Sequence, residues 1–123
     1  MPHSILLVDD NRVIRRLLRE MFEGAGFVCS ESENGQQAVA EAERLKPDLI
    51  VLDYSMPVMN GLEAAPLLRK LLPQTPILMF TMFANQLFTE QALAEGVTAV
   101  VSKDQAAAHL LPKAESLLKT ART

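Results

Sequence analysis

The sequence predicts an α/β fold in which five strands form one parallel sheet with helices on both faces. Apolar runs of strand length alternate with longer segments whose apolar residues recur at helical spacing, strand first, five times along the chain. The runs at 5–8, 49–52 and 77–80 are apolar at every position. Such runs are typical of strands buried on both faces of a parallel sheet, and the alternation favours helical crossovers between them.

Each predicted strand ends at a turn residue or at a polar side chain. The run at 27–32 is the weakest of the set, and the run at 99–101 is short. The strands are expected at residues 5–8, 27–32, 49–52, 77–80 and 99–101.

The first helix is expected to begin after Asn11, a good capping residue, and to end at Gly24 and Gly26. Its apolar residues form one stripe, made of Val13, Ile14, Leu17, Leu18, Met21 and Phe22. Its arginines fall mostly off this stripe, and we interpret them as a solvated face rather than as a docking patch for an acidic partner. These arginines are Arg12, Arg15, Arg16 and Arg19.

Apolar spacing predicts four further helices: after the turn at 34–35, after Gly61, over residues 85–95, and near the C-terminus. Pro66 lies near the first turns of the third helix, where it removes one backbone hydrogen bond without breaking the helix. Pro112 interrupts the early part of the last helix, which we therefore expect to start late or to bend.

Composition indicates a single domain over residues 1–123. A net charge of -3 and a pI near 5.3 argue against direct nucleic-acid binding. The single cysteine, Cys29, excludes an internal disulfide and fits a reducing compartment. We find neither a signal-peptide pattern nor an apolar segment approaching the roughly 20 residues of a membrane span, so the protein is predicted to be cytoplasmic and to have no membrane partner.

Polar side chains follow four of the predicted strands at their carboxyl ends. Ligands of open parallel α/β sheets bind outside the carboxyl ends of the strands. We therefore expect these side chains to converge at one edge of the sheet. They are Asp9, Asp10, Asp53, Thr81 and Lys103.

Carboxylates held this close together require a cation. Two of them repel each other by roughly 4 kcal/mol at about 4 Å and an effective dielectric of about 20. Mg²⁺ takes oxygen ligands from carboxylates and phosphates, and no cluster of Cys and His points to zinc. Helix capping is an alternative explanation for Asp9 alone, but it does not account for three aspartates together with Lys103.

These residues make the chain resemble the receiver domains of bacterial two-component response regulators over almost its full length. The resemblance depends on the motifs ILLVDDN at 5–11 and DYSMPVMNG at 53–61, with Thr81 closing a strand and Lys103 after the last strand. The motif at 53–61 is the most specific. The resemblance implies a doubly wound, flavodoxin-like fold of receiver type, and transfer of a phosphoryl group to Asp53 from a sensor histidine kinase or a phosphotransfer protein.

The resemblance also implies roles for the other residues. Lys103 would pair with a phosphoryl oxygen, and the Thr81 hydroxyl would turn toward it. The new charge of about -1.5 to -2 would bias the surface around the fourth helix and fifth strand and change partner binding or dimerisation. The implied Mg²⁺ ligands are the carboxylates of Asp9, Asp10 and Asp53 and the backbone carbonyl of Ser55.

Three positions depart from the usual pattern of this family. Val100 stands where an aromatic residue on the fifth strand often swings inward with the threonine. Met82 follows Thr81 where a small residue is usual, and its bulk could restrict access to the site. Asp104 replaces a common proline after Lys103, so no cis-proline bond is expected there.

Two other functions stay open. One is a Mg²⁺-dependent phosphohydrolase with Asp53 as nucleophile. Phosphatases of the haloacid-dehalogenase type carry a second Asp two residues further on, where this chain has Ser55, a poor base. The other is a phosphorylation-independent binding module with a receiver fold. We favour a switch over a turnover enzyme. Its further partners would be a downstream protein or an output domain outside this sequence, or a second copy in a homodimer.

Overall fold

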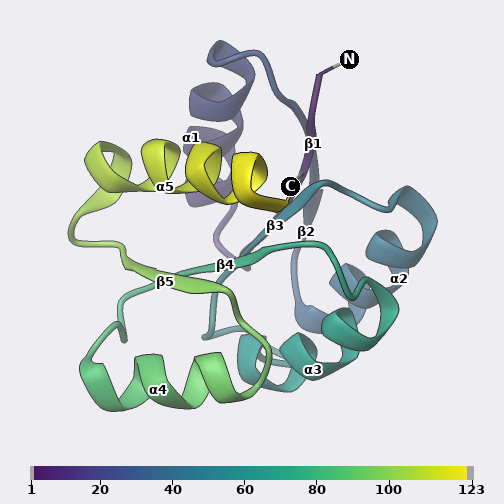
Figure 1. The fold of residues 1–123 in the computed structure, drawn as a ribbon, viewed down its shortest axis with the longest axis vertical. Helices are drawn as coiled ribbons and strands as arrows, with labels where there is room; N and C mark the ends of the chain where they lie inside the picture. The colour runs from purple at the N-terminus through teal and green to yellow at the C-terminus, as the bar shows by residue number, and fades with distance from the viewer. Residues whose placement is uncertain (1, 122–123) are drawn as a thin grey trace.

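The structure is a computed structural model that describes residues 2–121. Within this range five parallel strands form one sheet in the order β2-β1-β3-β4-β5, with helices between them (Figure 1), so the predicted fold class is confirmed. Residues 1 and 122–123 of the predicted domain lie outside the described range. The elements are β1 (Ser4–Val8), α1 (Arg12–Gly24), β2 (Val28–Ser32), α2 (Gly35–Leu45), β3 (Leu49–Leu52), α3 (Gly61–Leu71), β4 (Ile77–Thr81), α4 (Gln86–Ala94), β5 (Ala99–Ser102) and α5 (Ala106–Ala121).

The helices form two layers around the sheet. Helices α1 and α5 cover one face, and α2, α3 and α4 cover the other (Figure 1). Each face buries its own apolar cluster because successive strand side chains point to opposite sides. Leu18 and Phe22 of α1 pack with Leu110 of α5 on the first face. Small residues allow the helices to approach the second face closely, among them Ala38, Ala42, Ala64, Ala65 and Ala92.

The strand register brings the carboxyl ends of the strands to one edge. Val8 of β1 pairs with Leu52 of β3, and Thr81 of β4 pairs with Ser102 of β5. Asp9 and Asp53 each follow directly after one of the paired residues Val8 and Leu52, so they lie side by side on neighbouring strands. This register places the predicted site residues together.

Helix α1 is rotated relative to the prediction. Its buried residues are Arg15, Leu18 and Phe22, whereas Val13 and Leu17 are 65% and 56% exposed. The interpretation of Arg15 as part of a solvated face is therefore wrong. Arg15 is turned inward because its guanidinium finds hydrogen-bond acceptors at the end of β1 and on β2.

Two helices contain a proline, and the prediction is confirmed for α3 but not for the start of α5. Helix α3 continues through Pro66, as expected. Helix α5 begins at Ala106, six residues before Pro112, so of the two expected alternatives, a late start or a bend, the late start is wrong. Pro112 removes one hydrogen bond inside this helix, and the neighbouring residues Leu110 and Ala114 are fully buried. Across residues 2–121, no helix combines the length and apolar character needed to cross a membrane.

Arg69 of α3 joins the end of its helix to the connection between α4 and β5. Its guanidinium donates hydrogen bonds to four backbone carbonyls and to one hydroxyl, and among the described residues it has no carboxylate partner. The acceptors are the carbonyls of Leu72, Pro73, Thr75 and Gly96 and the hydroxyl of Thr98.

Replacing this guanidinium should destabilise the fold. We expect Arg69→Met to lower the free energy of unfolding by about 2 kcal/mol, because partly buried carbonyls lose their donors. Lys70→Met is the matched control, since the neighbouring Lys70 is exposed, and it should stay within about 0.5 kcal/mol of wild type. Urea unfolding followed by circular dichroism measures both variants, and equal stabilities would contradict the role given to Arg69.

Candidate functional site

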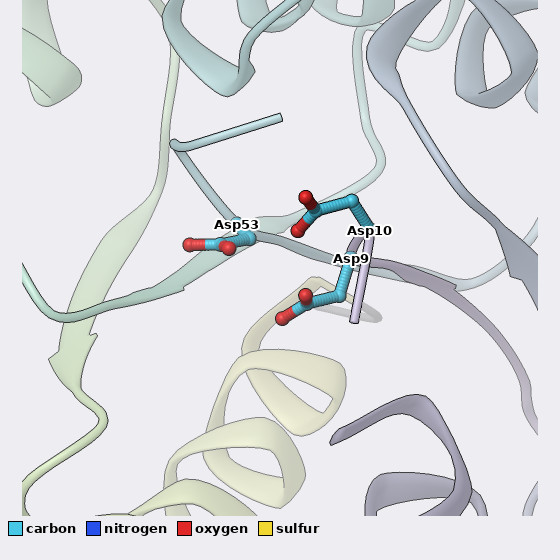
Figure 2. Close-up of side chains that lie close together, drawn as sticks. All are labelled: Asp9, Asp10 and Asp53. Carbon is cyan, nitrogen blue, oxygen red and sulfur yellow. The ribbon is translucent and has the colours of Figure 1, made fainter. Parts of the chain in front are cut away.

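Three aspartates face one another at the carboxyl edge of the sheet. Asp9 and Asp10 follow β1, and Asp53 follows β3; Figure 2 shows the three side chains close together. One carboxylate oxygen from each lies within 4.8 Å of the others. The convergence predicted from the strand ends is confirmed for these three residues.

Lys103 completes the charged cluster from the end of β5. Its ammonium lies 2.8 Å from Oδ2 of Asp9 and 3.2 Å from Oδ2 of Asp53, so it bridges two strands. The Lys103 backbone N–H donates to the Thr81 carbonyl at 2.9 Å, which holds the residue beside β4. The side chain also passes over the Phe80 ring, with the ammonium 5.9 Å from its centre. Both predicted positions, Thr81 and Lys103, thus lie at the same edge as the aspartates.

The Asp53 carboxylate is buried beside a second acidic group. Asp9 and Asp53 are only 2% and 6% exposed, while Asp10 is exposed to solvent. Burial raises the pKa of Asp53, and the charge of Asp9 raises it further; Lys103 and the Tyr54 N–H, 2.8 Å from Oδ1, offset only part of this. Burial alone would lower the pKa of Lys103, but its bonds to the two carboxylates raise it above its ordinary value. One ammonium shared between two acids therefore leaves excess negative charge.

The donor set fits a divalent cation. Three carboxylates and one ammonium carry charges of -3 and +1, which leave a net charge of -2. The ligand atoms are all oxygen, as Mg²⁺ prefers, and the exposed Asp10 leaves one side open for water or a phosphate. Ser55 is exposed in the loop after Asp53. The structure of residues 2–121 does not test whether its backbone carbonyl is a ligand, so this role stays a prediction.

The loop between β3 and α3 is held against the site by two glycines. The Gly61 N–H donates to the Tyr54 carbonyl, and the Gly35 N–H donates to the Met59 carbonyl, both at 2.9 Å. A Cβ at Gly61 would lie 2.2 Å from the carbonyl oxygen of Asp53. Glycine is required at this position because another backbone passes where a side chain would begin.

Val58 in the same loop has a strained backbone. Its φ is +69°, which β-branched residues strongly disfavour, and the residue is 75% exposed. We expect Val58→Asn to raise the free energy of unfolding by about 1 kcal/mol, because Asn adopts the left-handed conformation more readily. The same change at Val28, exposed in β2, should lower stability, since Asn is disfavoured in strands. Urea denaturation distinguishes the two directions, and parallel losses would argue against strain at Val58.

An aromatic cluster that the sequence did not predict lies beside the site. Tyr54, Phe83 and Phe88 bring their rings within 5.2–6.4 Å of one another. The Thr81 hydroxyl accepts a hydrogen bond from the Phe83 N–H at 3.3 Å. Val100, by contrast, packs partly buried beside the second apolar cluster. The aromatic residues near Thr81 thus come from two loops and α4 rather than from β5.

The other two departures have simple structural consequences. Met82 is 59% exposed. Asp104 is exposed, its N–H donates to the Ser102 hydroxyl at 3.2 Å, and all peptide bonds of the described residues are trans.

Comparison with known sequences agrees with the arrangement of the site. The family model described as the response regulator receiver domain matches residues 5–115. The chain is 39% identical over 125 residues to protein-glutamate methylesterase/protein-glutamine glutaminase 3 of Hahella chejuensis, an alignment that covers 97% of this chain and 36% of that protein. It is 32% identical over 104 residues to the chemotaxis protein CheY of Thermotoga maritima, covering 84% of this chain and 87% of CheY. The chain spans between 36% and 56% of the length of three curated relatives that it matches, the methylesterase among them.

Solved structures of related domains also resemble this chain. The response regulator domain of Thermotoga maritima CheB superimposes with a TM-score of 0.90 at 29% identity, covering 97% of this chain and 98% of that one. The chemotaxis protein CheY4 of Vibrio cholerae superimposes with a TM-score of 0.89 at 28% identity, covering 95% and 99%. The likeness therefore extends over nearly all of this chain.

Proposed function

Because this chain belongs to the response regulator receiver domain family, we propose that it is a phosphorylation switch in which Asp53 accepts a phosphoryl group with the help of Mg²⁺. One observation carries the proposal: three carboxylates and one ammonium meet at the carboxyl edge of the sheet with a net charge of -2. Such a cluster is costly unless a cation or a reaction partner uses it.

The cation would be held by four protein oxygens. When bound, Mg²⁺ supplies positive charge that stabilises the oxygens of a transferring phosphoryl group. The single ammonium of Lys103 offsets only part of the repulsion between Asp9 and Asp53, and the cation would offset the rest. The proposed ligands are the carboxylates of Asp9, Asp10 and Asp53 and the backbone carbonyl of Ser55.

Asp53 would act as the nucleophile. An oxygen of its carboxylate forms a bond to phosphorus as the bond from phosphorus to the imidazole nitrogen of the donor breaks, and that electron pair stays on the nitrogen. Lys103, already in contact with Asp53, would pair with a phosphoryl oxygen of the product.

Thr81 and the aromatic cluster provide a route from the site to α4. The Thr81 hydroxyl accepts a bond from the Phe83 N–H and keeps its proton for a second acceptor, which a phosphoryl oxygen would supply. Turning Thr81 toward that oxygen would weaken its bond to Phe83, whose ring packs near Tyr54 and Phe88. The structural change would thus pass through Phe83 to α4. It would not need an aromatic residue on β5, where this chain has Val100.

The expected test is phosphorylation with a small donor. Incubation with acetyl phosphate and Mg²⁺ should add one phosphoryl group to wild type, and peptide mapping should locate it on Asp53. Chelation of Mg²⁺ should suppress the label, and hydrogen exchange should change in α4 once the label is present. A label on another residue, or full labelling in the presence of a chelator, would contradict the proposal.

The partners follow from this function. The phosphodonor would be a sensor histidine kinase or phosphotransfer protein. The recipient of the signal would be a downstream protein, a second copy of the chain, or an output domain, since several relatives are much longer than this sequence. We propose a cytoplasmic location and no direct nucleic-acid contact for this domain, in line with its net charge of -3.

A turnover phosphatase is the alternative. Ser55, two residues after Asp53, offers no carboxylate to activate water. We therefore expect slow release of the phosphoryl group and no multiple turnover on phosphate monoesters; rapid multiple turnover would favour the phosphohydrolase.

A further inference from the structure

We propose that Arg15 is a positioning residue of the cation site: it holds the peptide group between Asp9 and Asp10 and thereby sets the relative placement of the two carboxylates. This inference depends on the proposed function, because it concerns the same site. Arg15 does not itself contact the three-carboxylate centre through any described side-chain bond.

Arg15 reaches the site from the first turns of α1. It is only 7% exposed, and its Nη1 donates to the backbone carbonyl of Asp9 at 2.7 Å. That carbonyl belongs to the peptide plane that joins Asp9 to Asp10. A hydrogen bond to it therefore restricts the rotation that would swing one carboxylate relative to the other.

The positive charge of Arg15 is balanced away from the cation site. Its Nε donates to Glu31 on β2 at 2.8 Å, and Glu33 lies 3.7 Å from Nη2. The second oxygen of Glu31 accepts from Arg19 at 2.7 Å. Burial of the guanidinium is offset by these partners, so Arg15 can serve as a fixed donor beside a site for a cation.

Asp10 depends on the backbone for its position. Its side chain is exposed and makes none of the hydrogen bonds or salt bridges found among the described residues. Asp9, in contrast, is held through every polar group: its N–H donates to the Ser32 carbonyl at 3.2 Å, Oδ1 accepts from the Asn11 N–H at 2.9 Å, and Oδ2 accepts from Lys103. The Arg15 bond to the Asp9 carbonyl and the Asn11 N–H bond to Asp9 Oδ1 hold the two peptide groups that flank Asp10.

The direction of the effect separates positioning from simple electrostatics. Removing a positive charge near a cation site would by itself strengthen Mg²⁺ binding. Loss of a positioning hydrogen bond behind a ligand weakens metal binding, typically by 10- to 100-fold. A weakened affinity in an Arg15 variant would therefore exclude a purely electrostatic role.

The test is a titration of the whole chain with Mg²⁺ alone. Tyr54 is the single tyrosine, the chain has no tryptophan, and the Tyr54 N–H binds Asp53, so tyrosine fluorescence reports on the site. We expect Arg15→Met to weaken Mg²⁺ affinity by about tenfold. Arg15→Lys should recover part of the loss, because an ammonium can reach the carbonyl but cannot also keep the Glu31 bond.

Two controls address fold and charge. Leu18→Ala removes a core contact from the same face of α1 without touching Asp9, and should keep the wild-type Mg²⁺ affinity despite lower stability. Arg19→Met removes the other arginine bound to Glu31 and should change the affinity less than twofold. Titrations are made where each variant is folded by circular dichroism, and Arg15→Lys decides the question if Arg15→Met does not fold.

The outcomes distinguish this inference from the function on which it rests. Wild type that binds no Mg²⁺ overturns both. Wild type that binds Mg²⁺, with unchanged or tighter binding in every Arg15 variant that folds, overturns the positioning role only. Weakening of equal size in Leu18→Ala would assign the effect to general loss of stability and would also overturn it.

Discussion

Asp53→Asn should abolish phosphoryl labelling by acetyl phosphate and, without Mg²⁺, should unfold at a higher urea concentration than wild type. The amide has no carboxylate oxygen able to form the bond to phosphorus. It also removes a buried charge that lies beside Asp9, while Lys103 keeps its 2.8 Å bond to Asp9. We expect a gain of about 1–2 kcal/mol, because replacing buried charged groups by neutral ones can stabilise a protein by about that amount.

The sign of the pH dependence supports this expectation. The folded-state pKa of Asp53 is raised, so the folded protein binds its proton more tightly than the unfolded chain does. Wild-type stability from this group is therefore present below its ordinary pKa and is lost as the pH rises through the raised value. Asp53→Asn lacks this loss, so the two urea midpoints should separate progressively as the pH rises through that range.

Mg²⁺ should reverse the order of the two proteins. A ligand that binds only the folded state stabilises it by about 2.7 kcal/mol at a concentration of about 100 times its Kd. Wild type should gain this increment, and Asp53→Asn, with one ligand lost, should gain less. Paired urea titrations with Mg²⁺ and with a chelator measure both effects. A variant that is less stable than wild type in the chelator would refute the view that charge repulsion dominates this site.

The fold and most of the site could be predicted because local pattern and topology agree. Residues 49–52 are apolar throughout and form β3 within the predicted bounds. The convergence of Asp9, Asp53 and Lys103 needed no side-chain detail, because the carboxyl ends of parallel strands share one edge.

The features that were missed depend on contacts between distant residues. The periodicity of α1 assigns Val13 to the core and Arg15 to solvent, yet Arg15 is buried through acceptors on β1 and β2. Glu31 lies sixteen residues further along the chain, beyond the reach of any helical pattern. Nothing in the spacing of Phe83 and Phe88 along the chain shows that their rings meet Tyr54.

Gly61→Ala should be among the most damaging single-methyl changes near the site. Its Cβ would lie 2.2 Å from the backbone oxygen of Asp53 and 3.0 Å from the terminal carbon of Met79. The methionine can move, but the main chain of Asp53 is held at the end of β3, because the Asp53 N–H donates to the Val8 carbonyl at 2.9 Å. Alanine gains about 1 kcal/mol of helix propensity at the start of α3, yet the backbone collision costs about 3 kcal/mol or more.

The same collision should also slow the chemistry. Relieving it requires the main chain of Asp53 to shift, and a displacement of about 1 Å at a reacting group can cost about 100-fold in rate. Gly24→Ala is the matched control, because a Cβ added at Gly24 would meet no neighbouring atom within 4 Å, and it should be neutral or slightly stabilising. Urea unfolding and the initial rate of labelling by acetyl phosphate measure both variants. If Gly61→Ala matched Gly24→Ala in stability and labelling rate, the close packing of α3 against Asp53 would not constrain the phosphoryl acceptor.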